Sequence, residues 1–416
     1  MLPVSAASGT GTRFVDALFT STSAVCVTGL VVHNTAAYWS VFGQVVILLL
    51  IQAGGLGIMT YATAHALVTG RRVTLKERIM IQEQMGYWSL SGLVGLMKEV
   101  ILFTLVFEAV GALVLGVAFS CSMGLELGEA VFFGVFHSIS AFCNAGFDIT
   151  GSSLMECSGA PWIIIPISLL IILGGVGFYV IADLYSNKAK WGKLSLHTRV
   201  ALKMTVILLL VGTVFVYALE KDNPATIGNM SIGDKLLSSW FQSVTPRTAG
   251  FNSIATEGLR IPTAFFVILL MFIGASPGGT GGGIKTTTFY STFKFVVSSV
   301  RGQEDVNVSK RRLPRNLVTR ALVIVLLSIG LIVTSTLLLT ITEDAEFLDI
   351  LFEVVSAFGT VGLSRGLTPS LSDLGKIVLT ITMFAGRVGP LSFMIAIYRN
   401  SQKPNIRYSE ERVSVG

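Results

Sequence analysis

The chain has 416 residues, of which 52% are hydrophobic and only 13% charged, and its formal net charge is +6. Soluble globular domains carry roughly a quarter charged residues. This composition therefore excludes a soluble enzyme and predicts a polytopic membrane protein.

The distribution of charge predicts the orientation in the membrane. Segments 71–83, 188–199, 294–320 and 399–412 hold nineteen basic residues against six acidic ones, whereas the last three alternate connections hold fourteen acidic residues against five basic ones. Excess Lys and Arg marks the cytoplasmic side. We therefore expect a cytoplasmic C-terminus and a lipid membrane as the surroundings, and we assign the positive charge to topology rather than to nucleic acid.

The apolar runs predict an all-α polytopic membrane protein with seven spans and four re-entrant loops. A span needs about 20 apolar residues. The first repeat begins directly at its pore helix, without a leading span, which predicts an internal start or an incomplete gene model. The expected spans are 38–68, 92–119, 162–185, 198–219, a long segment 262–300, one before the fourth pore helix, and 374–398; pore helices are expected at 13–24, 234–245 and 347–358, with another in the second repeat.

The stretch SAFCNAGFD, residues 140–148, recurs in four degenerate copies that align on one glycine each. An aromatic residue stands ten positions before each glycine and, in three copies, a serine stands six positions before it, with Val244 in the third copy. We therefore expect four tandem span–pore-loop–span repeats with pseudo-fourfold symmetry around one pore. The repeats are 1–69, 70–187, 188–301 and 302–398, followed by a cytoplasmic tail at 399–416.

A short helix that ends in a glycine between two spans is typical of a cation-channel pore loop. Glycine reaches backbone conformations closed to other residues, so carbonyl oxygens can face one axis and replace the hydration shell of a cation. A lone glycine would instead indicate a helix C-cap, but four copies at matching positions favour the pore loop. The candidate ion-binding residues are Val27, Thr28, Gly29, Asn144, Ala145, Gly146, Thr248, Ala249, Gly250, Thr360, Val361 and Gly362.

A second glycine signature follows each loop, at 54–57, 174–177 and 386–389, where glycine in a span favours close helix packing. The third copy, GASPGGTGGGIK at 274–285, contains Pro277 and too much glycine for continuous helix. It predicts that the helix is interrupted inside the membrane, by a loop that could obstruct the pathway below the filter. Ile284 separates its last glycine from Lys285, which excludes a phosphate-binding loop. The candidate gate residues are Gly278, Gly279, Thr280, Gly281, Gly282, Gly283 and Arg387.

Ionisable residues inside spans are candidate functional sites. Arg387 is read as a fixed positive charge beside the pore, acting as a barrier to the cation or an anchor for the loop carbonyls; a structural link between spans is the alternative. Lys285 is expected to extend towards the inner surface, and Glu108 to form a helix-to-helix hydrogen bond. Arg247 is expected to point away from the axis and brace its loop against an outer acidic residue. His65, His137 and His197 show no metal-binding pattern, and the pairing of Cys121 with Cys157 stays open.

Six motifs resemble the membrane subunit of the Ktr potassium-uptake system (KtrB/KtrD type), of the Trk/Ktr/HKT superfamily. They are VTGL (27–30), SAFCNAGFD (140–148), TPRTAGFN (245–252), SAFGTVGL (356–363), GGGIK (281–285) and GRVGPLSF (386–393). The resemblance implies four pseudo-symmetric units around a K⁺ pore, with the broken third-unit span as a gating loop that Arg387 helps to hold. It also implies a preference for potassium, because family members with glycine in all four loops prefer it.

The same resemblance implies a homodimer on a cytoplasmic ring of RCK-type subunits that bind ATP/ADP or NAD, and it leaves c-di-AMP open as a further ligand of that ring. We expect potassium uptake across the bacterial plasma membrane, driven by the membrane potential and without a cofactor in this chain. Na⁺ stays open as a coupling ion. The alternatives are a sodium-permeable or poorly selective relative and a non-conducting membrane scaffold.

Overall fold

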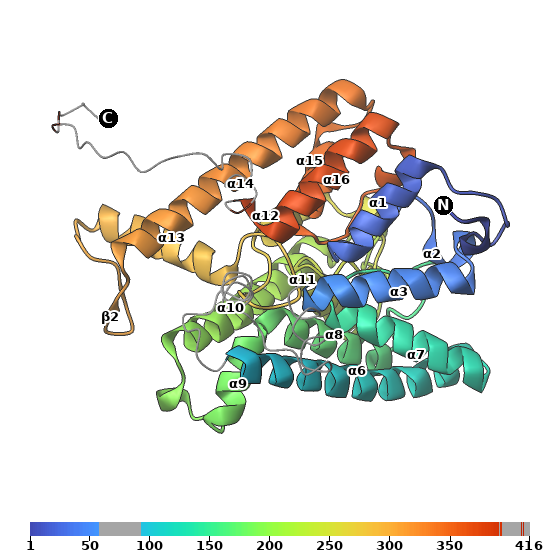
Figure 1. Ribbon diagram of the computed structural model, residues 1–416, viewed down its shortest axis with the longest axis horizontal. Coiled ribbons are helices and arrows are strands. Elements are labelled where there is room, and N and C mark those ends of the chain that lie inside the picture. The colour runs from blue at the N-terminus through green and yellow to red at the C-terminus, as the bar shows by residue number, and fades with distance from the viewer. Residues whose placement is uncertain (58–92, 391, 393–408, 410, 412–416) are drawn as a thin grey trace.

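The computed structural model describes residues 1–57 and 93–390, together with 392, 409 and 411. The basic segment 71–83, His65, the end of the last expected span and the tail 399–416 lie outside the described residues. Within the described ranges the regular secondary structure is almost entirely helical. Figure 1 shows the connecting loops meeting at the centre of the molecule, between α1, α14 and α16 on one side and α6, α7 and α8 on the other.

The described helices are grouped here by the four predicted repeats. Repeat one contributes α1 (Phe14–Val25), α2 (Thr35–Tyr38) and α3 (Val41–Leu56), and repeat two α6 (Leu93–Met123), α7 (Leu127–Phe142), α8 (Pro161–Val176) and α9 (Phe178–Ser186). Repeat three contributes α10 (Leu196–Glu220), α11 (Ile232–Val244), α12 (Ile261–Phe272) and α13 (Thr286–Val300). Repeat four contributes α14 (Arg315–Thr342), α15 (Phe347–Gly359) and α16 (Asp373–Val388). Short 3₁₀ turns lie at Pro3–Ser5, Trp191–Lys193, Thr256–Gly258 and Thr368–Ser370.

Local sequence signals begin these helices. Ser40 and Ser372 cap α3 and α16, where each side chain accepts a hydrogen bond from a backbone N–H three residues on. Such caps satisfy donors that have no partner in the first helical turn. Helices α8 and α12 begin instead with a proline in their first two positions, where a missing N–H costs nothing.

Three described helices are long and apolar enough to cross a membrane: Met97–Met123 within α6, α10 and α14. Their apolar residues are largely exposed at the surface of the chain, among them Leu113 on α6, Val214 on α10 and Leu326 on α14. Exposed apolar faces of this size mark contact with lipid or with another protein. The exposed faces therefore agree with the multi-pass membrane protein that the composition predicts.

The span expected at 162–185 is not continuous. Helices α8 and α9 meet at Gly177 with a bend of 92°, and Gly177 has a φ of +103°. Helices α3 and α16 also end at a glycine with positive φ. Gly57 follows α3 and has a φ of +83°, and Gly389 follows α16 and has a φ of +93°. The glycine signature was interpreted as packing alone, but its last glycine also ends the helix. The remainders of the spans expected at 38–68 and 374–398 lie outside the described residues.

A small hairpin adds the only strands found in the described ranges. β1 (Asn307–Val308) pairs antiparallel with β2 (Arg311–Arg312) in the basic segment between α13 and α14. It extends away from the helices (Figure 1).

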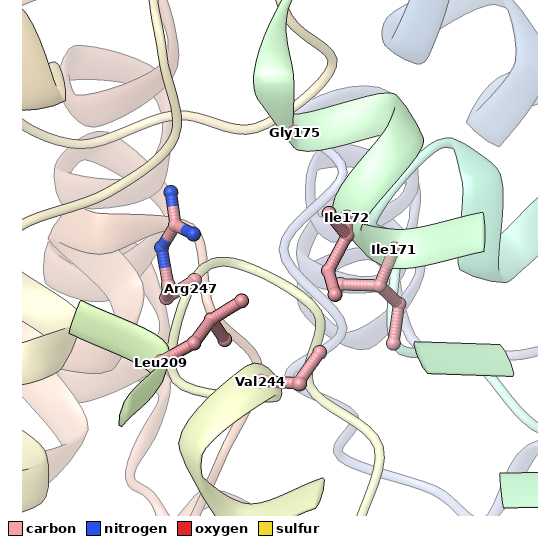
Figure 2. A pocket seen from close by; sticks show the side chains of 6 residues that line it. All are labelled: Ile171, Ile172, Gly175, Leu209, Val244 and Arg247. Atoms are coloured by element: carbon pink, nitrogen blue, oxygen red, sulfur yellow. The ribbon is translucent and has the colours of Figure 1, made fainter. Parts of the chain in front are cut away.

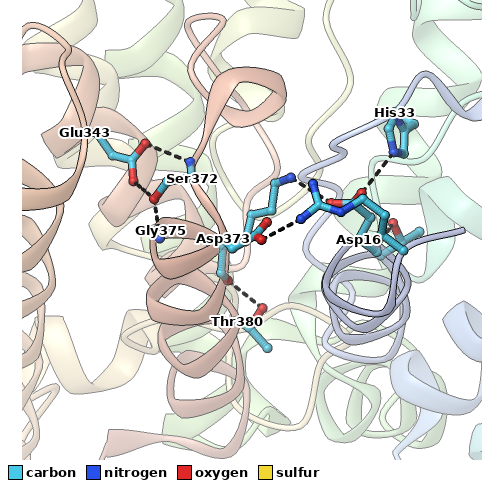
Figure 3. A network of polar contacts seen from close by, with 10 residues as sticks. Asp16, His33, Glu343, Ser372, Asp373, Gly375 and Thr380 are labelled. Carbon is cyan, nitrogen blue, oxygen red and sulfur yellow. Dashed lines mark hydrogen bonds and ion pairs between the residues drawn. The ribbon is translucent and has the colours of Figure 1, made fainter.

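The first and last repeats meet through α1 and α16. Lys376 Nζ lies 2.7 Å from Asp16 Oδ1, and both side chains are almost completely buried. Figure 3 shows His33 directed towards Asp16, with His33 Nε2 3.6 Å from Asp16 Oδ2. An exposed pair, Arg13 with Asp373 at 2.5 Å, lies beside them. These contacts join the two ends of the four-repeat arrangement.

Candidate ion pathway

The four aligned glycines meet in a closed ring, and all four have positive φ values between +69° and +94°. A Cβ atom built on Gly29 would lie 2.5 Å from Ala145 O, and one on Gly146 would lie 2.8 Å from Ala249 O. One on Gly250 would lie 2.5 Å from Val361 O, and one on Gly362 would lie 2.2 Å from Thr28 O. Each glycine therefore touches the backbone of the next loop in chain order, and the last touches the first. We call these four residues the glycine ring.

The residues before the glycines have matching backbone conformations. Two positions before each glycine the φ is again positive although the residue has a side chain: Val27 (+55°), Asn144 (+59°), Thr248 (+76°) and Thr360 (+50°). Such values are uncommon outside glycine and indicate a backbone that its surroundings constrain. The structure thus brings together all twelve candidate ion-binding residues in four equivalent, tightly packed segments.

Side-chain hydroxyl groups connect each candidate filter segment to the helix that precedes it. Ser23 Oγ and Ser356 Oγ accept from the backbone N–H of Gly29 and Gly362, each at 3.1 Å. Ser140 Oγ donates to Phe147 O at 2.7 Å. In the third repeat Val244 cannot do this, and Thr245 Oγ1 donates to Phe251 O at 2.7 Å instead. The hydroxyl group of the third repeat thus stands at Thr245, one position after Val244, the residue that aligns with the serines.

Arg247 has its hydrogen-bond partner on α10 and not in an outer acidic residue. Its Nη2 donates to Thr205 Oγ1 on α10 at 3.3 Å, and its Nε has no hydrogen-bond partner among the described residues. Figure 2 shows the guanidinium beside a cavity of about 10 Å³ that Ile171 and Leu209 also line. That volume admits one water molecule.

The glycine-rich break, residues 274–285, joins α12 to α13 and lies directly against the pore loops. Thr280 Oγ1 donates to Phe142 O at 3.1 Å, and Gly282 N donates to Thr360 Oγ1 at 3.0 Å. A Cβ on Gly281 would lie 1.9 Å from Thr248 Oγ1. The break is therefore packed against the candidate filter segments that contain Thr248 and Thr360 and against the end of α7.

The break also pairs with the bend in repeat two. Ser276 N donates to Gly175 O at 2.9 Å, Thr280 N to Gly174 O at 3.1 Å, and Phe178 N to Gly278 O at 3.0 Å. These bonds satisfy backbone groups that neither broken helix can satisfy internally, which a non-helical backbone at membrane depth requires.

Arg387 joins the break to repeat one. Its Nη1 donates to Thr280 O, and its Nη2 donates to Gly54 O and, at 3.3 Å, to Gly55 O. Three roles were considered for Arg387: a barrier to the cation, an anchor for loop carbonyls and a link between spans. These contacts are the ones expected of an anchor for carbonyl groups. They also make it a link between helices.

Lys285 does not extend towards the inner surface. Its Nζ donates to Gly281 O at 2.6 Å, so the lysine that ends the break also binds the carbonyls of the break. The sequence-based expectation was wrong because a lysine beside free carbonyl groups can satisfy its donors locally, without reaching water.

The other candidate residues have their partners in the surrounding helices. Glu108 forms the expected helix-to-helix hydrogen bond, accepting from Gln52 Nε2 at 3.0 Å. His137 is buried, with its Nδ1 2.8 Å from Phe133 O, and His197 packs on Tyr179. No cluster of three or more metal-binding side chains occurs in the described part of the chain.

Cys121 and Cys157 are free thiols that line one pocket of about 560 Å³. Burial raises the pKa of the Cys157 thiol, and the neighbouring Glu156 carboxylate raises it further. The sequence left this pairing open, and the structure has no disulfide between the two residues.

Comparison with known proteins identifies the family. Residues 3–407 match the model of the TrkH family, described as cation transport protein. The chain is 42% identical to Ktr system potassium uptake protein B of Bacillus subtilis, over all of this chain and 92% of that protein. It is 37% identical to the potassium/sodium uptake protein NtpJ of Enterococcus hirae, over all of this chain and 92% of that protein.

The fold also matches a solved structure. The crystal structure of the potassium transporter TrkH from Vibrio parahaemolyticus superimposes with a TM-score of 0.74 and 19% identity, covering 93% of this chain and 79% of that one. The matching proteins are transporters rather than enzymes. The chain belongs to the TrkH family of cation transport proteins.

Proposed function

We propose that this chain is the pore-forming membrane subunit of a potassium uptake system, and that the ion passes through the glycine ring. The closed cycle of contacts from Gly29 through Gly146 and Gly250 to Gly362 carries this proposal. Four loops that meet around one axis can place carbonyl oxygens where they replace a cation's hydration shell. The names of the relatives, potassium uptake proteins, support potassium as the ion.

The membrane potential is sufficient to drive this uptake. Moving one charge across the membrane gains about 2.3 kcal/mol per 100 mV, so an inside-negative potential accumulates a monovalent cation without ATP hydrolysis by this chain. Each loop has one filter glycine, where a usual potassium channel has two. We therefore expect fewer well-formed ion sites and weaker selectivity than in such channels.

The glycine-rich break is proposed as the gate. It lies against Thr248 and Thr360 of the filter segments, and Arg387 and Lys285 bind its carbonyls. Release of these contacts would move the break away from the pathway. The word system in the relatives' names supports a separate regulatory partner. We propose that this partner is a cytoplasmic RCK-type ring that binds nucleotide, and that the chain acts as a homodimer with a cytoplasmic C-terminus.

Flux in liposomes tests the proposed pore. With an imposed inside-negative potential, ⁸⁶Rb⁺ uptake should be blocked by external potassium and little affected by sodium. Comparable uptake of ²²Na⁺ would replace the potassium assignment with a sodium-permeable pore, a candidate that the name of the Enterococcus relative favours. Absence of both fluxes, with and without a cytoplasmic nucleotide-binding partner, would favour the non-conducting scaffold.

A further inference from the structure

Glu108 is a buried acidic side chain that the proposed pore does not use. It lies in the middle of α6, where it is the only charged residue between Val100 and Met123, and only 6% of it is exposed. Its Oε2 accepts from Gln52 Nε2 of α3 at 3.0 Å, and its Oε1 lies 3.8 Å from Cys143 Sγ at the end of α7. Ionisable groups at membrane depth are costly and mark function by default. This one connects α6, α3 and the base of the second pore loop.

Gln52 belongs to the last two turns of α3, which end beside the gate arginine. Gly54 and Gly55 follow it, and α3 ends at Leu56. Their carbonyl groups therefore have no partner within the helix, and both accept from Arg387 Nη2. This turn cannot shift freely, because a Cβ on Gly55 would lie 2.5 Å from Cys143 Sγ.

Hydrogen bonds on both sides of the C-terminal end of α3 thus connect α6 to the break, with the backbone of α3 from Gln52 to Gly55 between them. Glu108 binds Gln52, the next turn of α3 binds Arg387, and Arg387 Nη1 binds Thr280 O of the break. We propose that Glu108 is a positioning residue for the gate: it orients the end of α3 so that the Gly54 and Gly55 carbonyls hold Arg387 against the break. This inference rests on the proposed function of the break as a gate.

The test compares ⁸⁶Rb⁺ influx into liposomes that contain the full chain without a cytoplasmic partner. Glu108→Leu removes the acceptor for Gln52 and should raise influx about two- to thirty-fold, the range that residues along a coupled network produce. The rubidium-to-sodium ratio should not change, because the glycine ring is not touched. Glu108→Gln keeps an oxygen acceptor and should behave as the wild type.

Two further variants separate this role from a merely structural one. Ser138→Ala removes the 2.7 Å bond from Ser138 Oγ to the backbone oxygen of Glu108 and should leave influx unchanged, because that bond lies outside the connection between α6 and the break. Gln52→Leu removes the Glu108–Gln52 hydrogen bond from the α3 side, and the Gln52 side chain is only partly buried. If Glu108→Leu does not fold, this variant tests whether the hydrogen bond positions the gate.

Arg387→Ala distinguishes failure of this inference from failure of the gate itself. If Arg387→Ala leaves influx unchanged, the gate assignment is wrong. If Arg387→Ala raises influx while folded Glu108→Leu and Gln52→Leu do not, the gate stands and the role of Glu108 is overturned.

Discussion

Each glycine of the ring meets two separate constraints. Its φ is positive, and the backbone of the next loop occupies the space that a side chain would need. Residues with a Cβ pay about 1–3 kcal/mol for a sparsely populated backbone conformation, and here a collision is added. The four positions therefore determine how closely the four loops approach one another.

We expect Gly29→Ser and Gly250→Ser to lower the preference for potassium over sodium by about tenfold. Each new Cβ would lie 2.5 Å from a carbonyl oxygen of the neighbouring loop, so the ring must open. About 1.4 kcal/mol corresponds to tenfold, which is within the strain that such a substitution introduces. The measurement is the ratio of ⁸⁶Rb⁺ to ²²Na⁺ uptake in liposomes.

Gly330→Ser is the matched control, since no described atom lies within 4 Å of its Cβ position on the exposed face of α14. Its ratio should equal that of the wild type. Unchanged ratios in both ring variants would refute the filter assignment.

Residue-level prediction from the sequence succeeded where the repeats agree and failed where one repeat departs from the others. Alignment on one glycine located all four ring positions. It placed Val244 at the serine position of the third repeat, although Thr245 makes the anchoring bond. The partner of Arg247 is Thr205, which lies 42 residues away on another helix, and no local sequence pattern predicts this contact.

At the scale of elements, the helix that follows the loop in repeats one, two and four (α3, α8 and α16) combines close packing with an abrupt end. A Cβ on Gly54, Gly174 or Gly386 would lie 1.9 Å from the last or near-last carbonyl of the repeat's own pore helix. Three residues later a glycine with positive φ ends the helix. The sequence predicted the packing, but it could not separate the two roles, because both require glycine at adjacent depths.

Gly177→Ala should lower the apparent melting temperature of the protein in detergent and change its ion flux. The new Cβ would lie 2.6 Å from Pro277 O, in addition to the strain of a φ of +103°. Because the bend between α8 and α9 pairs with the glycine-rich break, relief of this collision must displace the break.

Gly302→Ala provides the comparison. Gly302 also has a positive φ, of +68°, but no described atom within 4 Å of a Cβ. It should show only the smaller effect of backbone strain, with normal flux. Equal melting temperatures for the two variants would show that the packing of the break on Gly177 adds nothing to stability.

At the scale of the whole molecule, four repeats in one chain form a closed arrangement only if the last repeat contacts the first. The recurring motifs predict the order and the common direction of the repeats. They do not predict the contact that joins the ends, because Asp16 and Lys376 are 360 residues apart and neither belongs to a recurring motif. Their pairing depends on the tertiary arrangement of α1 and α16 (Figure 3).

Lys376→Met should destabilise the protein strongly. It leaves the Asp16 carboxylate, 5% exposed, without its main partner at 2.7 Å, and removal of one member of a buried ion pair typically costs about 3–5 kcal/mol. The double variant Asp16→Asn/Lys376→Met removes both charges and should recover most of the loss, since the attraction of a buried pair largely offsets its desolvation.

The neighbouring pair supplies the control for this last effect. Arg13 and Asp373 connect the same two helices, but their side chains are 64% and 48% exposed, and exposed pairs contribute only about 0–1 kcal/mol. Arg13→Gln should therefore leave the apparent melting temperature nearly unchanged. If Lys376→Met lowers it no more than Arg13→Gln does, or if the double variant is no more stable than Lys376→Met, the buried pair does not join the first and last repeats, and apolar packing between α1 and α16 does so instead.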